Sequence, residues 1–134
     1  MEIKRDFYLN ELIDRMDNGL IKIVTGMRRC GKSYLLDPIF KDYLIGQGVE
    51  ADHIIMLSLD ERANKKYLNP DELDQYIRSL IVDNKKYYLL LDEIQEVKEF
   101  ESVLIGFMHI NNVELYVTGS NSKFLSSDIV TEFR

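Results

Sequence analysis

The chain has 134 residues, of which 46% are hydrophobic and 30% are charged, proportions that are ordinary for one globular domain. Seventeen lysine and arginine residues against 23 aspartate and glutamate residues give a net charge of −6, so no overall positive field draws these residues to nucleic acid or to an anionic membrane. A single cysteine excludes an internal disulfide. There is neither an apolar run of about 18 residues nor a signal peptide, which predicts a cytoplasmic protein without a membrane span.

The first half of the chain predicts a helix, a strand and a second helix. Apolar residues spaced from Phe7 to Met16 are typical of one face of a helix. Residues 21–25, which are rich in β-branched side chains, predict the strand. An apolar stripe over residues 35–44 predicts the second helix, with an interruption at Pro38 because proline does not fit a regular helix interior.

The second half of the chain continues the alternation. Three further apolar runs are as short and as continuous as strands covered on both faces, namely residues 53–59, 87–92 and 114–119. Asn69 and Pro70 predict the start of a helix over residues 69–81, and residues 100–110 predict another. Strands that alternate with helices predict an α/β fold in which helices cover both faces of a parallel sheet.

The segment GMRRCGKS, residues 26–33, follows the first strand directly and opens a helix. It fits the pattern G-x-x-x-x-G-K-[ST], in which successive backbone N–H groups point at phosphate oxygens. Lys32 is predicted to contact the β- and γ-phosphates, and Ser33 to offer its hydroxyl to Mg²⁺. A chance match in a glycine-containing turn is the alternative, but it does not explain the flanking strand and helix. The predicted nucleotide-binding residues are Gly26, Met27, Arg28, Arg29, Cys30, Gly31, Lys32, Ser33 and Tyr34.

An acidic pair, Asp92 and Glu93, closes the apolar run YYLLLD. Burying ionised side chains at the end of a strand costs free energy, so their presence there suggests that a ligand or a reaction requires them. Asp92 is predicted to order Mg²⁺, and Glu93 to act as the catalytic residue that activates the water attacking the γ-phosphate. The alternative is a strand that ends in solvated acids before a turn, and the phosphate loop upstream argues against it.

A third polar cluster follows the last apolar run, in LYVTGSNSKF (residues 115–124). If this strand lies between the first and the third strand, its end falls between the phosphate loop and the acidic pair. Ser120 or Asn121 could then hold the attacking water or sense the γ-phosphate. An ordinary polar turn is the alternative, and the residues themselves do not choose between Ser120 and Asn121.

Together, the segments TGMRRCGKS, LLLDEIQ and YVTGSNSKFLS resemble the prokaryotic AAA-type ATPases that carry a C-terminal domain of unknown function. This family belongs to the additional-strand, catalytic-glutamate division of phosphate-loop NTPases. The resemblance covers nearly the whole chain and implies a three-layer α/β/α sandwich with sheet order 5-1-4-3-2, in which Ser120 and Asn121 lie beside the phosphate loop. The family often supplies an arginine after GSNS, and Arg134 stands near that position.

The family continues past the point at which this chain ends. We therefore expect residues 1–134 to form an ATPase core without the fifth strand, which would leave the first strand at an open sheet edge. The leading hypothesis is Mg²⁺-dependent binding and hydrolysis of ATP that drives an unknown protein partner or C-terminal domain. The alternatives are a nucleotide-switched interaction module with little hydrolysis, which could engage DNA or protein through its missing part, and a phosphate-loop kinase. No acceptor site or basic lid for a kinase is evident, and the sequence indicates no oligomeric state.

Overall fold

The computed structural model describes residues 2–25, 29–119 and 130–133. In chain order its elements are α1 (Glu2–Asp14), β1 (Ile21–Val24), α2 (Arg29–Tyr34), η1 (Leu35–Phe40), α3 (Lys41–Gly46), η2 (Ala51–His53), β2 (Ile54–Ser58), η3 (Arg62–Leu68), α4 (Pro70–Leu80), β3 (Tyr87–Asp92), η4 (Ile94–Glu96), α5 (Phe100–Met108), β4 (Val113–Thr118) and β5 (Val130–Phe133). The four predicted strands are confirmed, each to within about one residue at either end.

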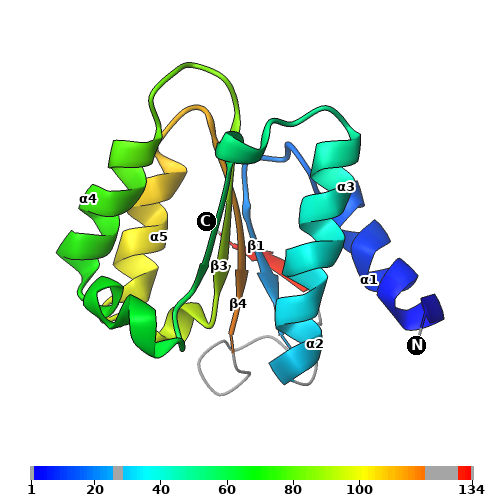
Figure 1. The fold of residues 1–134 in the computed structure, drawn as a ribbon, viewed down its shortest axis with the longest axis horizontal. Helices are drawn as coiled ribbons and strands as arrows, with labels where there is room; N and C mark the ends of the chain where they lie inside the picture. The colour runs from blue at the N-terminus through cyan, green and yellow to red at the C-terminus, as the bar shows by residue number, and fades with distance from the viewer. Residues whose placement is uncertain (1, 26–28, 120–129, 134) are drawn as a thin grey trace.

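The strands form one sheet in the order β2-β3-β4-β1-β5. Within it, β2, β3, β4 and β1 are parallel to their neighbours. Figure 1 shows α4 and α5 on one face of this sheet and α1, α2 and α3 on the other. The predicted α/β fold, its three layers and the sheet order implied by the resemblance are therefore confirmed.

The fifth strand corrects one expectation. β5 pairs with β1 in antiparallel orientation, with Ile21 opposite Phe133 and Val24 opposite Val130. The prediction of a sheet without a fifth strand, and of an open edge at β1, is wrong, because this pairing satisfies the outer backbone groups of β1. A four-residue strand carries almost no periodicity, and its pairing with β1 spans most of the chain, so the sequence pattern did not reveal it.

Two apolar clusters fill the space on either side of the sheet, and β3 contributes to both. Successive residues of a strand point to opposite faces. Leu89 and Leu91 accordingly join the cluster under α4 and α5, while Leu90 joins the one under α1 and α3. Burial on both faces explains why the run YYLLLD is continuously apolar rather than alternating.

Two local helix signals act as the sequence predicts. Asp37, which precedes Pro38, leaves the helical region with φ −141° and ψ 111°, because the proline ring disfavours helical geometry in the preceding residue. Asn69 begins α4 by accepting hydrogen bonds from the N–H groups of Asp71 and Glu72. A side-chain cap of this kind is worth about 1 kcal/mol.

His53 joins two segments at the amino ends of β2 and β3. Its imidazole is buried, with Nδ1 2.7 Å from Asp52 Oδ1 and Nε2 2.9 Å from Asp83 Oδ2. The hydrogen bond with Asp83 raises the pKa of His53, and Asp52 adds to this rise, against desolvation, which lowers it. Through these two contacts the imidazole ties the start of β2 to the loop that precedes β3.

The thermal stability of the protein is expected to decrease as the pH rises above the unfolded-state pKa of histidine, about 6.5. Because the folded-state pKa of His53 is raised, its contribution is complete below the unfolded value and is lost as the pH passes the folded value. The melting temperature measured between about pH 5.5 and 8 should fall more in the wild type than in His53→Gln. The exposed His109 supplies the control, His109→Gln. A slope that His53→Gln leaves unchanged would contradict the assignment.

Candidate functional site

The carboxyl ends of β1, β3 and β4 meet at one edge of the sheet. These strands run parallel, and the carboxyl edge of a parallel sheet is where such folds bind ligands. The helix α2 follows β1 and brings Lys32 and Ser33 to this edge, while β3 ends there with Asp92 and is followed by Glu93. Two motifs about sixty residues apart in sequence are thus in contact, since Ser33 and Asp92 are hydrogen-bonded.

Asp92 is 1% exposed and accepts hydrogen bonds on both carboxylate oxygens. The Ser33 hydroxyl donates to Oδ2 at 2.6 Å, and the Thr118 hydroxyl donates to Oδ1 at 2.6 Å. Burial raises the pKa of Asp92, against these two hydrogen bonds, which lower it. A buried carboxylate beside a serine hydroxyl is the hard oxygen-donor set that Mg²⁺ prefers, and a cation there would offset the cost of burying the charge.

Lys32 reaches across the same edge. Its side chain is buried, and Nζ donates to the carbonyl oxygen of Gly119 at 2.9 Å and lies 3.8 Å from Glu93 Oε2. An ammonium group has three donors and no acceptor. Lys32 can therefore exchange a neutral carbonyl for phosphate oxygens, which form stronger, charge-assisted hydrogen bonds.

Glu93 has an unusual backbone. Its φ of 56° and ψ of 52° lie in the left-handed region, which costs a residue with a side chain roughly 1–2 kcal/mol. Its N–H donates to Thr118 Oγ1 at 2.8 Å, which holds this conformation, and the residue as a whole is 6% exposed. Strain of this kind persists where the surrounding structure over-determines it, and it concentrates at functional sites.

Several predicted site residues lie outside the described part of the chain, namely Gly26, Met27, Arg28, Ser120, Asn121 and Arg134. The other predicted loop residues, Arg29, Cys30, Gly31 and Tyr34, belong to α2 together with Lys32 and Ser33. The helix expected directly after the phosphate loop is thus present. The roles assigned to Ser120 and Asn121 stay predictions.

Sequence reasoning missed two residues that the structure brings to the acidic pair. Thr118 contacts both acids, because its hydroxyl donates to Asp92 and accepts from the backbone of Glu93. Aligning the ends of neighbouring strands could have found it, since Leu91 pairs with Val117 in the sheet. Gln95 donates from Nε2 to Glu93 Oε1 at 2.7 Å, and only its closeness to Glu93 in sequence hinted at this contact.

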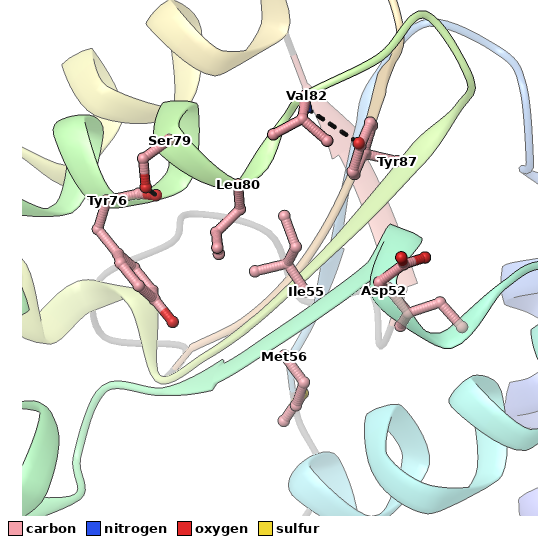
Figure 2. Close-up of a pocket in the computed structure, with 9 residues that line it drawn as sticks. Asp52, Ile55, Met56, Tyr76, Ser79, Leu80, Val82 and Tyr87 are labelled. Atoms are coloured by element: carbon pink, nitrogen blue, oxygen red, sulfur yellow. Dashed lines mark hydrogen bonds between the residues drawn. The ribbon is translucent and has the colours of Figure 1, made fainter.

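A hollow of about 390 Å³ lies beside β2, away from these residues. Figure 2 shows Ile55 of β2 together with Leu80 and Val82 around it, and the Val82 N–H donates to the Tyr87 hydroxyl at 3.0 Å. Neither the acidic pair nor any residue of α2 lines this hollow. The candidate site is instead the cluster at the carboxyl edge of the sheet.

Comparison with known proteins links the chain to one family. The model of a family described as "AAA domain" matches residues 18–134. An uncharacterized protein of Haemophilus influenzae is 32% identical over 130 residues, which are 96% of this chain and 32% of the relative. Uncharacterized protein MJ1544 of Methanocaldococcus jannaschii is 33% identical over 119 residues, which are 85% of this chain and 24% of the relative.

These relatives are much longer than the chain, which spans between about a quarter and a third of their length. No solved structure matches the chain significantly. Among the residues that the structure describes, every helix is too short or too polar to cross a lipid bilayer.

Proposed function

Because the chain belongs to the AAA domain family, we propose that it binds ATP with Mg²⁺ and hydrolyses the nucleotide to ADP and phosphate. The observation that carries the proposal is the convergence of a buried lysine and a buried acidic pair at one sheet edge. Lys32 lies directly after the phosphate-loop glycines in sequence, as required for a side chain that must reach the β- and γ-phosphates.

Each contacting residue has a separate role in this proposal. Ser33 and Asp92 would hold Mg²⁺, which when bound neutralises charge on the phosphate oxygens. Lys32 would leave the Gly119 carbonyl for the nucleotide. Glu93 would act as the general base: the water oxygen bonds to the γ-phosphorus, the bond from that phosphorus to the ADP oxygen breaks, and a water proton passes to the Glu93 carboxylate.

The chain is expected to release phosphate from ATP in the presence of Mg²⁺ and to stop when the metal is chelated. A colorimetric phosphate assay with MgATP, with EDTA, and with EDTA followed by excess Mg²⁺ measures this, while equilibrium dialysis measures nucleotide binding separately. Transfer of labelled phosphate to an added acceptor instead of water would favour a kinase. Phosphate release that EDTA leaves unchanged would contradict the metal role of Ser33 and Asp92.

The second candidate is a nucleotide-operated switch, and one contact favours it. Lys32 donates to the Gly119 carbonyl at the end of β4, so binding that draws Lys32 to phosphate would release the start of the segment that follows β4. Such a switch needs binding but no turnover. Tight ATP binding without phosphate release would favour it over hydrolysis.

The greater length of the relatives supports a further part of the proposal. A nucleotide-dependent core of this size would act on another part of a longer protein or on a separate protein partner. Adding such a partner should change the rate of phosphate release if hydrolysis drives it.

A further inference from the structure

Gln95 forms a hydrogen bond with Glu93 that has no part in the mechanism proposed above. It lies in η4, the short helical segment after β3, and its Nε2 donates to Glu93 Oε1 at 2.7 Å. A contact of Nε2 with Glu96 Oε2 is much longer, at 3.5 Å. An ionised carboxylate only accepts hydrogen bonds, so the amide must present its nitrogen, and not its oxygen, to Glu93.

The two oxygens of the Glu93 carboxylate therefore have different surroundings. Oε1 is held by Gln95, while Oε2 faces Lys32 Nζ at 3.8 Å. Movement of Lys32 toward a nucleotide would free Oε2 and leave Oε1 in place. The oxygen released to accept a proton is then the one that points toward the phosphate-binding lysine.

The other atom of the Gln95 amide has no partner among the described residues. Gln95 Oε1 is out of contact with solvent and accepts no hydrogen bond there. A buried acceptor without a donor is costly, and native structures usually supply a donor, often a water molecule. Because no water-sized space touches Gln95 Oε1 within the described part of the chain, the contact of Gln95 that bears on the site is the one that Nε2 makes with Glu93.

We propose that Gln95 is a positioning residue for this site: Nε2 fixes the Glu93 carboxylate through its Oε1, so that Oε2 is the oxygen available to accept the proton of the attacking water. The inference rests on the proposed hydrolysis. With the carboxylate held in this way, Oε2 faces the reacting water and can take its proton while the water oxygen attacks the γ-phosphorus. Orientation of this kind raises the turnover rate without adding affinity for the nucleotide.

The test compares Gln95→Ala and Gln95→Glu with the wild type by kcat, KM and MgATP affinity. Both variants are expected to lower kcat by about tenfold to a hundredfold and to change affinity less than about threefold, since misplacing a reacting group costs rate on this scale. Gln95→Glu keeps the size of the side chain but cannot donate to a carboxylate. Gln75→Ala, on the exposed face of α4, is the matched control.

A double-mutant cycle tests whether the effect of Gln95 on kcat depends on the Glu93 carboxylate. If Gln95 acts through Glu93, then Gln95→Ala should slow turnover little further in a Glu93→Gln background. An unchanged kcat in both single variants, or full additivity in the cycle, overturns the role of Gln95 while the proposed hydrolysis stands. If the wild-type chain binds MgATP but releases no phosphate, that result would contradict both the proposed hydrolysis and the role of Gln95.

Discussion

Glu93→Gln is expected to bind MgATP as the wild type does and to release phosphate at least about 100-fold more slowly. Glutamine has nearly the same shape as glutamate, and its amide oxygen can still accept the hydrogen bond that Gln95 donates at 2.7 Å. The backbone N–H that donates to Thr118 is unaffected. The substitution removes the basic oxygen that accepts the proton. We therefore expect kcat to fall and the affinity for MgATP to stay unchanged.

Single-turnover phosphate release and fluorescent-nucleotide binding separate these two effects. Glu96→Gln is the matched control, because Glu96 is an exposed carboxylate three residues along the chain. It should leave both measurements near the wild-type values. Equal turnover in Glu93→Gln and the wild type would remove Glu93 from the role of general base.

Lys32→Ala is expected to weaken ATP binding at least about 30-fold, since truncating one partner of a buried charged pair costs about 2–5 kcal/mol. The Lys32 ammonium lies 3.8 Å from Glu93 Oε2 and forms an ion pair with this carboxylate. Its loss removes the charge offered to the nucleotide and leaves the Glu93 carboxylate without that neighbour. Isothermal titration calorimetry with MgATP measures the affinity.

The fold of the variant has to be checked alongside its affinity. Within the described part of the chain, Lys32 donates a hydrogen bond to the Gly119 carbonyl, and the loss of this one contact is expected to leave the circular dichroism spectrum of Lys32→Ala like that of the wild type. Lys66→Ala, at an exposed lysine of η3, is the control for removing one positive charge. Wild-type affinity in a folded Lys32→Ala protein would exclude the phosphate-contacting role.

Much of the fold was predictable because its signals are local. The run YYLLLD is apolar throughout since β3 is buried on both faces, and Asn69 begins α4 through two hydrogen bonds to residues that follow it directly. Glycine spacing, capping residues and apolar runs depend on neighbours within a few positions. These signals sufficed for the first four strands, for the helices between them and for the α/β class.

The candidate site was predictable only in part. Lys32, Ser33, Asp92 and Glu93 stood out as candidates because phosphate and metal chemistry would require those residue types next to a glycine loop and at the end of a buried strand. Thr118 was overlooked in favour of the polar residues after it. Its contact with Asp92 depends on how β4 aligns with β3, and strand register is set by packing across the sheet.

The sequence by itself determined the α/β class and pointed to the glycine segment of residues 26–33 and to the acidic pair as candidates, because the signals for each lie within a few consecutive residues. Only the tertiary structure decided which side chains meet there and how the sheet ends. Lys32 bonds to a carbonyl 87 residues away, and β5 pairs antiparallel with β1 across most of the chain. Such contacts follow from strand register and from the packing of helices on both faces, which no short stretch of sequence specifies.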